Sequence, residues 1–372
     1  MKKIAVLTTS RADYGILSPI LKEILKRKNL KLELIVSGSH LSPNYGCTIN
    51  EIERDGFKIS SKIEMLLASN TPSSISKSIG IGVIGFTDAL VSIKPDILIL
   101  LGDRFETLSC AIAALPLNIK IAHIHGGEET EGAFDNSIRH SITMMAHLHF
   151  ASTREYAKRI VQMVGGNEKV FFTGAPALDN LKYVKFYKEK EFEKIIEFPL
   201  NPKPLLITFH PVTREIENTK YYIKELLSAL KHFNLPLIFT MPNQDTYNSI
   251  IRKEILNFSK DYKNSKVFEN LGTEKYFNLM KYSLAMVGNS SSGIIEAPSF
   301  KLPVANIGTR QEGRIKAKNV IDVGYKREEI IKGIEKAISK EFKDSLKNLK
   351  NPYGDGKASK KIVDILEKEL LK

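Results

Sequence analysis

The chain has 372 residues, 42% hydrophobic and 26% charged, which is typical of a globular protein and excludes disordered, collagen-like and coiled-coil classes. This length predicts two domains, each with its own core. The formal net charge of +13 favours anionic partners, but the lysines are scattered among glutamates with no arginine-rich stripe. We therefore expect a solvated lysine-rich surface and no nucleic-acid partner.

The two cysteines, Cys47 and Cys110, have no CxxC spacing and are interpreted as reduced thiols. The first apolar run, from Ile4 to Leu7, is shorter than a signal-peptide core. The longer apolar stretch at Pro95–Leu101 has the length of a strand. We expect a cytoplasmic protein with no membrane partner.

The hydrophobic pattern predicts two successive series of strands and helices. The first series comprises strands at Ile4–Thr9, Lys31–Val36, Pro95–Leu101 and Ile119–His125, with an amphipathic helix at Ile16–Lys26. The second comprises strands at Pro204–Phe209, Leu235–Met241, Leu284–Val287 and Pro303–Ile307, with a helix at Lys220–His232. Strands that are apolar throughout and alternate with helices indicate parallel sheets covered on both faces. The fold class is therefore α/β, with two doubly wound domains facing a cleft.

The expected N-terminal domain covers residues 1–183 and the expected C-terminal domain covers residues 184–350. The charge-rich stretch Tyr183–Pro204 is the predicted linker between them. The last segment, residues 351–372, is expected to form a helix that packs back on the first domain. In such sheets ligands bind beyond the carboxyl ends of the strands, so the loops that follow strands are the candidate sites.

Two loops of the first domain carry polar residues after a strand. Ser10 and Arg11 lead from the first strand into a helix, where free N–H groups and a guanidinium suit a phosphate. The alternative is that Ser10 only caps the helix and Arg11 is solvated. Asp103 follows Gly102 at the end of a buried strand and is placed either to meet a ligand or to cap the next helix.

The segment from His123 to His140 is the densest polar cluster of the chain. Its candidate acid/base residues are His125, Glu128, Glu131 and Asp135, with Arg139. A zinc site built on His123 and His125 is the alternative, but no third ligand is evident, so we predict no metal. Carboxylates beside a histidine fit general acid/base work, because burial and mutual repulsion separate their pKa values.

Three loops of the second domain carry the remaining candidates. His210 follows the strand at Pro204–Phe209 and is a candidate catalytic residue. The turn from Asn289 to Gly293 joins a strand to a helix, and its hydroxyls and amides suit a diphosphate, with Glu296 placed for a ribose. The alternative is a serine-capped helix with a solvated glutamate. Arg310 and Arg314 supply further cations.

These motifs resemble the hydrolysing UDP-N-acetylglucosamine 2-epimerases of bacterial sialic-acid synthesis. The matching motifs, in order, are SRADYG, GDRFE, HIHGGE, DNSIRH, FHPVT, GNSSSGIIE, GTRQEGR and NPYGDG. The resemblance covers nearly the whole chain and implies a glycosyltransferase-B type fold, in which two Rossmann-like domains close on a nucleotide sugar. It also implies a cytoplasmic homodimer or homotetramer with no cofactor.

The resemblance implies that UDP-N-acetylglucosamine and water give N-acetylmannosamine and UDP through a 2-acetamidoglucal intermediate, for sialic-acid or capsule synthesis. Asp103, Asp135 and His210 match catalytic positions, and Arg139 supports Asp135. The expected nucleotide-binding residues are Arg11, Asn289, Ser290, Ser291, Ser292, Gly293, Glu296, Arg310 and Arg314. Many relatives carry a glutamate where this chain has His125, so its acid/base work is expected to pass to His125, Glu128 or Glu131.

Other functions stay open at this point. The same reaction on GDP- or UDP-linked N,N'-diacetylbacillosamine, for legionaminic acid synthesis, is the nearest alternative. A reversible epimerase and a glycosyltransferase of the same fold are further enzymatic ones. A non-catalytic nucleotide-sugar-binding protein would be expected to keep the serine-rich turn and to lose Asp103, Asp135 and His210, all of which are present.

Overall fold

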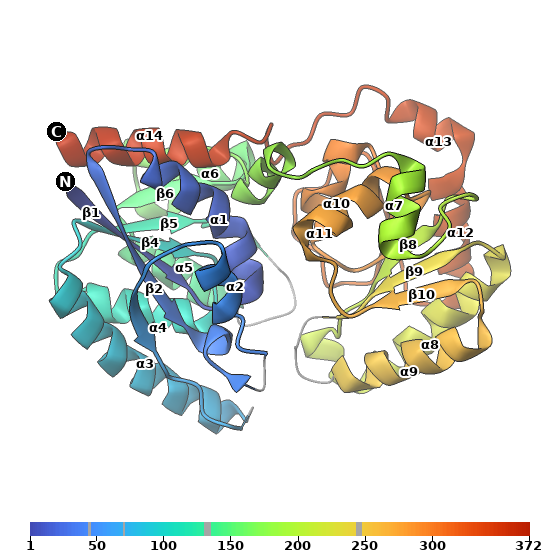
Figure 1. The fold of residues 1–372 in the computed structure, drawn as a ribbon, viewed down its shortest axis with the longest axis horizontal. Helices are drawn as coiled ribbons and strands as arrows, with labels where there is room; N and C mark the ends of the chain where they lie inside the picture. The colour runs from blue at the N-terminus through green and yellow to red at the C-terminus, as the bar shows by residue number, and fades with distance from the viewer. Residues whose placement is uncertain (44–45, 70, 130–134, 243–247) are drawn as a thin grey trace. The chain divides into compact units, whose positions relative to one another are not determined.

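The computed structural model describes residues 1–43, 46–69, 71–129, 135–242 and 248–372. The chain folds into two compact units (Figure 1). The first contains Met1–Glu128, the described residues from Asp135 to Asn180, and Tyr353–Lys372. The second contains Leu181–Pro352.

The first unit is built on a seven-stranded sheet in the order β3-β2-β1-β4-β5-β6-β7. Its strands are β1 (Lys2–Thr8), β2 (Leu30–Ser37), β3 (Ile59–Ile63), β4 (Ile97–Leu101), β5 (Ile121–Ile124), β6 (Leu148–Ala151) and β7 (Val170–Phe172). Every pair of neighbouring strands is parallel. The chain order reverses between β1 and β4, which is where ligands bind in doubly wound sheets.

Helices cover both faces of this sheet because successive residues of each strand point to opposite faces and both sets are apolar. The helices are α1 (Arg11–Leu25), α2 (Ile49–Arg54), α3 (Pro72–Ile93), α4 (Phe105–Ala114), α5 (Asp135–Met145), α6 (Arg154–Val164) and α14 (Ala358–Leu371). In β1, Ile4 and Val6 pack into the cluster formed with α1 and α14. Ala5 and Leu7 pack into the opposite cluster, formed with α3 and α4.

The second unit is built on a six-stranded sheet in the order β10-β9-β8-β11-β12-β13. Its strands are β8 (Leu205–Thr208), β9 (Leu237–Thr240), β10 (Ser265–Phe268), β11 (Ala285–Gly288), β12 (Val304–Ile307) and β13 (Val320–Val323). Their pairing is again parallel throughout. The order reverses between β8 and β11, so the loops after these two strands flank the corresponding position.

The helices of the second unit also cover two faces. They are α7 (Glu189–Ile196), α8 (Thr219–Leu230), α9 (Asn248–Asp261), α10 (Gly272–Tyr282), α11 (Ser292–Ile295), α12 (Arg327–Ile338) and α13 (Lys340–Ser345). Leu205 and Ile207 of β8 face the cluster with α8, α9 and α12. Leu206 faces the opposite cluster, with α7 and α10.

The prediction of a linker at Tyr183–Pro204 is wrong. This stretch contains α7, whose Phe192 and Ile196 are buried in the core of the second unit. The charges that suggested a linker lie on the exposed side of an amphipathic helix.

Among the residues that the structure describes, one helix, α3, is long and apolar enough to cross a membrane by length and composition. In the structure it packs against α4 and β3. Phe86, Leu90 and Ile93 of α3 are part of the core of the first unit. Core helices of soluble proteins can have the same length and apolar composition, so α3 is weak evidence for a membrane span.

Candidate functional site

In the first unit, the candidate residues gather at the carboxyl ends of three neighbouring strands. Asp103 follows β4, His125 follows β5 and Ser152 follows β6. Since β4, β5 and β6 are parallel and adjacent, their ends bring these residues to one edge of the sheet. Parallel topology therefore brings together Asp103 and His125, which the sequence predicts as site residues, and Ser152, which it does not.

The side chain of Arg139 connects two of these loops. One nitrogen, Nη2, contacts Oδ2 of Asp103 in an ion pair. The other, Nη1, donates to the backbone oxygen of Glu128 at 2.8 Å and to Oδ1 of Asn136 at 2.8 Å. Arg139 is buried, whereas Asp103 keeps 24% of its side chain exposed. Asp135 begins the same helix, α5, one turn before Arg139.

His125 and Glu128 form a buried pair. Nδ1 of His125 lies 2.5 Å from Oε1 of Glu128, and the hydroxyl of Ser152 donates to the same oxygen at 2.6 Å. Because a carboxylate can only accept, Nδ1 carries the proton, and in the neutral ring Nε2 holds a lone pair. Nε2 is buried and has no hydrogen-bond partner among the described residues. This nitrogen is therefore placed to accept or return a proton.

The backbone that carries this pair depends on two glycines. His125 itself adopts a left-handed conformation, with φ of 64°, and its N–H donates to the carbonyl of Phe150. A Cβ at Gly126 would lie 2.9 Å from Oγ1 of Thr143, and one at Gly127 would lie 2.7 Å from the carbonyl of Tyr156. A strained non-glycine residue held by its surroundings is a feature of functional sites. The glycines of HIHGGE thus allow Glu128 to turn back on His125.

His123 contributes to the frame of this site. Its Nε2 donates to the carbonyl of Gly102 at 2.8 Å, and its Nδ1 lies 3.1 Å from Oγ1 of Thr143. Burial lowers the pKa of His123 to about 4, so the ring is neutral at neutral pH. The ring ties the loop before Asp103 to α5.

The loop after β1 places Ser10 and Arg11 at the N-terminus of α1. The hydroxyl of Ser10 caps α1 by accepting from the N–H of Asp13. Arg11 forms an ion pair with Glu51 at 3.3 Å, and 37% of its side chain is exposed.

In the second unit, His210 and Asn289 hold each other at the ends of the neighbouring strands β8 and β11. The N–H of His210 donates to Oδ1 of Asn289 at 2.7 Å, and Nδ2 of Asn289 donates to the carbonyl of His210 at 2.9 Å. Arg310, after β12, donates to the carbonyl of Asn289 at 3.1 Å. Burial, and then the charge of Arg310, hold the pKa of His210 well below its usual range. His210 is therefore a neutral side chain at neutral pH.

The serine turn leads from β11 into the short helix α11. Gly288 permits the turn, because a Cβ there would lie 1.9 Å from the carbonyl of Thr208. The hydroxyl of Ser290 accepts from the N–H of Ser292 at 3.4 Å, and Ser291 precedes α11 without a side-chain capping hydrogen bond. Since α11 ends at Ile295, Glu296 caps the C-terminal end of this helix instead of lying within it.

Tyr276 is a neighbour of this turn that the sequence did not indicate. Burial raises the pKa of its hydroxyl to about 12, while hydrogen bonds to the hydroxyls of Ser292 and Thr208 oppose the shift. The charge of Glu296 raises the pKa further. Tyr276 therefore stays protonated and lies among the hydroxyls of the turn. No spacing in the sequence links α10 to this loop.

A second group missed by the sequence analysis lies around Glu215. Its Oε1 accepts from the hydroxyl of Thr309 at 2.9 Å, and its Oε2 accepts from Tyr222 at 2.6 Å. The ring of Tyr222 stacks on Tyr325, whose hydroxyl accepts from the N–H of Thr309. Gln311 also donates to the carbonyl of Asn289. These contacts fix the loop that carries Arg310 and, four residues later, Arg314.

Two further predictions concern Glu131 and a metal site. Glu131 lies outside the residues that the structure describes. Within the described ranges there is no group of three histidine, cysteine, aspartate or glutamate side chains that could hold a metal ion. The two histidines of the zinc alternative also have different partners. The ring of His123 bonds to Gly102 and Thr143, whereas the ring of His125 bonds to Glu128.

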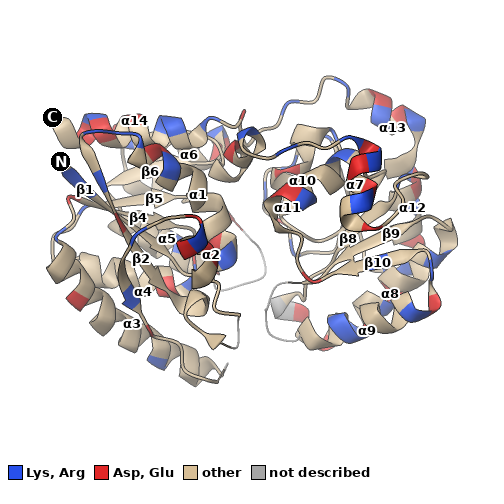
Figure 2. Ribbon diagram, in the orientation of Figure 1, with Lys and Arg blue, Asp and Glu red and all other residues tan. Residues whose placement is uncertain are grey.

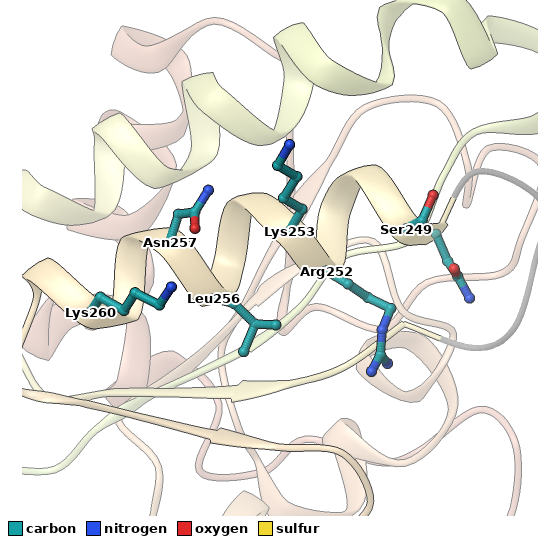
Figure 3. Close-up of a pocket in the computed structure, with 7 residues that line it drawn as sticks. Ser249, Arg252, Lys253, Leu256, Asn257 and Lys260 are labelled. Atoms are coloured by element: carbon teal, nitrogen blue, oxygen red, sulfur yellow. The ribbon is translucent and has the colours of Figure 1, made fainter.

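A surface hollow of about 480 Å³ runs along α9 (Figure 3). Its lining residues are Asn248, Ser249, Arg252, Lys253, Leu256, Asn257 and Lys260. All of them come from this one helix, and none is a predicted site residue. Since a ligand site is expected to draw polar groups from several elements, the hollow carries no assignment.

Comparisons with known proteins identify the family. The family model described as UDP-N-acetylglucosamine 2-epimerase matches residues 22–367. The GDP/UDP-N,N'-diacetylbacillosamine 2-epimerase (hydrolyzing) of Campylobacter jejuni is 43% identical over 92% of this chain and 89% of its own. The UDP-N,N'-diacetylbacillosamine 2-epimerase (hydrolyzing) of Legionella pneumophila is 38% identical over 99% of this chain and 96% of its own.

The fold agrees with solved structures. The UDP-GlcNAc 2-epimerase of Neisseria meningitidis, solved with UDP-GlcNAc bound, superposes with a TM-score of 0.86 at 23% identity, over 99% of this chain and 100% of that one. The predicted glycosyltransferase-B type fold, with two Rossmann-like parallel-sheet domains, is confirmed. The family match, together with these relatives, shows that this chain belongs to the UDP-N-acetylglucosamine 2-epimerase family.

Proposed function

We propose that this protein is a hydrolysing 2-epimerase that converts a nucleotide-linked 2-acetamido sugar and water into the free 2-epimeric sugar and a nucleoside diphosphate. The observation that carries the proposal is the buried chain from Ser152 through Glu128 to His125, beside the ion pair of Arg139 and Asp103. A protein that only binds nucleotide sugars has no use for such a proton-handling group. Membership of the epimerase family supports the same conclusion.

The reaction requires three kinds of groups. A base removes the proton from C2 of the sugar, and an acid protonates the departing glycosidic oxygen. In the hydration step a base takes a proton from the water that adds to C1, and an acid delivers a proton to the opposite face of C2, while cations or amides hold the diphosphate. Elimination gives a 2-acetamidoglucal, and water then adds across its double bond with inverted configuration at C2. Protons and water are exchanged and no electrons are transferred, so we propose no redox cofactor.

We assign one acid/base role to Nε2 of His125. Glu128 fixes the tautomer of the ring, and Ser152 orients the carboxylate that does so. The pair therefore resembles the carboxylate–histidine arrangement used for general base catalysis in other enzymes. It takes over the work of the glutamate that many relatives carry at the position of His125.

We assign the second acid/base role to Asp103 and Asp135. Arg139 holds Asp103 and the backbone of Glu128 at once, so it fixes the separation of the two proton-handling groups. A buried guanidinium favours the ionised form of Asp103. Asp135 lies one turn from Arg139 on α5, so the two carboxylates are proposed to share this role.

The second unit is proposed to hold the nucleotide. The hydroxyls of Ser290, Ser291 and Ser292, with the guanidinium of Arg310, suit the diphosphate. Glu296 is proposed to accept from the hydroxyls of the ribose, and Arg314 and Arg11 are further contacts proposed from their motifs. His210, neutral and buried beside Arg310, is proposed to donate to the leaving diphosphate without adding a charge.

N,N'-diacetylbacillosamine carried by UDP or GDP is the first candidate substrate. Two relatives at 43% and 38% identity are named for this sugar and for the hydrolysing reaction. UDP-N-acetylglucosamine, giving N-acetylmannosamine for sialic-acid synthesis, is the second candidate. It is favoured by the description of the family that matches residues 22–367.

The test is ¹H NMR of the purified protein in D2O with each of three substrates: UDP- and GDP-N,N'-diacetylbacillosamine and UDP-N-acetylglucosamine. A free 2-epimeric sugar deuterated at C2, together with free nucleoside diphosphate, is the expected result. Turnover of UDP-N-acetylglucosamine alone would select the second candidate. A nucleotide-linked epimer, or no turnover of any of the three, would refute the proposal.

A further inference from the structure

The motif NPYGDG, at residues 351–356, has no part in the proposed mechanism, but its first residue contacts the helix that ends before Glu296. Nδ2 of Asn351 donates to the carbonyl of Ile295 and to Oγ of Ser299, each at 2.8 Å. Ile295 immediately precedes Glu296, and Ser299 follows it. Asn351 therefore holds the chain on both sides of the residue that is proposed to accept from the ribose.

The carbonyl of Ile295 needs a donor from outside its helix. α11 ends at Ile295, and the last carbonyls of a helix have no partner within it. A further helical turn would use the N–H of residue 298 or 299. Pro298 has no N–H, and the N–H of Ser299 donates to the carbonyl of Glu296 at 3.0 Å. Asn351 thus supplies a hydrogen bond that the local sequence cannot make.

Glu296 lies where two short helices meet. It follows α11 and precedes the 3₁₀ helix η6 (Ala297–Phe300), and each of the two has only 4 residues. Helices of this length are not stable by themselves, so contacts from elsewhere in the fold must fix them. The amide of Asn351 ties the end of α11 to Ser299 of η6. It thereby fixes the direction in which the side chain of Glu296 leaves the backbone.

Asn351 is itself anchored on both sides along the chain. Leu346 before it and Tyr353 after it are fully buried, and Pro352 has a restricted φ. Lys350 is exposed, and Figure 2 shows blue residues along the connection between α13 and α14. The lysine charge therefore stays in solvent, while the neutral amide of Asn351 makes the contact with α11.

We propose that Asn351 is a positioning residue for Glu296, which sets the angle at which this carboxylate meets the hydroxyls of the ribose. The inference rests on the nucleotide site of the proposed function. A carboxylate that accepts from two neighbouring hydroxyls needs both oxygens in place, so a small rotation of its backbone loses one of the two bonds. Asn351 acts through Glu296 in this role and does not touch the nucleotide.

Isothermal titration calorimetry with UDP and 2'-deoxyUDP, and with GDP and 2'-deoxyGDP, tests this role. In the pair that it binds more tightly, the wild type is expected to prefer the ribonucleotide by about tenfold. Asn351→Ala is expected to reduce this preference to less than about threefold, because it weakens binding of the ribonucleotide and leaves that of the deoxynucleotide nearly unchanged. A merely structural role would weaken binding of both nucleotides equally.

Two further variants separate the role of Asn351 from a loss of folding. Asn351→Asp keeps the size of the side chain and loses the donor, so it is expected to behave as Asn351→Ala. The double variant Asn351→Ala/Glu296→Ala is expected to bind the ribonucleotide within about threefold of Glu296→Ala alone, since residues that act through one another are not additive. Lys350→Ala is the matched control and is expected to keep the wild-type preference, because it changes the neighbouring exposed residue. Thermal midpoints check the fold of each variant.

Three results would overturn the inference and leave the proposed function intact: a wild-type preference in both Asn351 variants, equal weakening of the two nucleotides, or a double variant in which the two losses add. A wild type that binds the ribonucleotide and the deoxynucleotide equally would exclude the ribose role of Glu296, and that of Asn351 with it. A wild type that binds neither UDP nor GDP would overturn the proposed function as well.

Discussion

Nδ1 of His125 donates to Oε1 of Glu128 across 2.5 Å, and both side chains are buried. This contact determines which nitrogen of the ring is left to accept a proton. Ser152 donates to the same carboxylate oxygen, so the loops after the neighbouring strands β5 and β6 both contribute to one proton-handling group. The proposed acid/base role can therefore be tested at Glu128, which contacts the ring of His125, and at Ser152, which contacts Glu128.

Glu128→Gln is expected to lower kcat by about 10²–10⁴-fold. The amide of glutamine can donate to Nδ1, which favours the tautomer whose Nε2 carries the proton and cannot accept another. Steady-state kinetics measures the effect. Glu155→Gln is the matched control, because Glu155 is an exposed glutamate in the first turn of α6. Wild-type kcat in Glu128→Gln would remove the pair from the mechanism.

Ser152→Ala tests the positioning of Glu128. The variant removes one hydrogen bond to a charged oxygen, so we expect kcat/KM to fall by about tenfold. Because Ser152 acts through Glu128, the loss is expected in kcat, with KM within about threefold of the wild type. A rise in KM with unchanged kcat, or wild-type activity, would exclude the positioning role.

Asp103→Asn is expected to abolish detectable turnover while leaving the affinity for UDP or GDP within about threefold of the wild type. The proposed nucleotide contacts lie in the second unit, whereas Asp103 belongs to the first. Asp135→Asn is expected to behave in the same way. Isothermal titration calorimetry measures the affinity, and a thermal midpoint checks the fold, since the buried Arg139 loses an anionic partner. Full activity in either variant would exclude that residue.

Glu296→Ala is expected to weaken UDP or GDP binding by about tenfold or more, because it removes the proposed acceptor of the ribose hydroxyls. Glu328→Ala on α12 serves as the control, since 70% of the Glu328 side chain is exposed. Calorimetry compares both variants with the wild type. An unchanged affinity in Glu296→Ala would refute the ribose role.

The sequence indicated the strand ends that carry the candidate residues because buried parallel strands are apolar throughout and stand out from their surroundings. It failed where strands are short or polar. His147 and His149 interrupt the hydrophobic pattern around β6, so the strand that presents Ser152 was not predicted. β10 and β13, only partly buried at the edges of their sheet, were missed for the same reason.

Contacts between distant segments were also beyond the sequence. Tyr276 reaches Thr208 and Ser292, and Arg139 reaches Asp103 across 36 positions of the chain. Only the packing of α10 and α5 on their sheets produces these pairs. Residue types at strand ends therefore predicted the candidates, whereas their hydrogen-bond partners required the structure.

Buried neutral histidines predict how stability depends on pH. Burial lowers the pKa of His40, His123 and His149 to about 4. In the unfolded chain their pKa values return to about 6.5. Below this value the unfolded state binds more protons than the folded state, so the free energy of unfolding is expected to decrease as the pH falls from about 6.5 to about 4.

Each such histidine contributes a slope of up to about 1.4 kcal/mol per pH unit within that window. His149→Asn should therefore reduce the slope of the free energy of unfolding against pH, measured by urea denaturation between pH 4.5 and pH 7. His232→Asn is the matched control, because 48% of the His232 side chain is exposed. A slope that His149→Asn leaves unchanged would mean that His149 is already protonated in the folded protein.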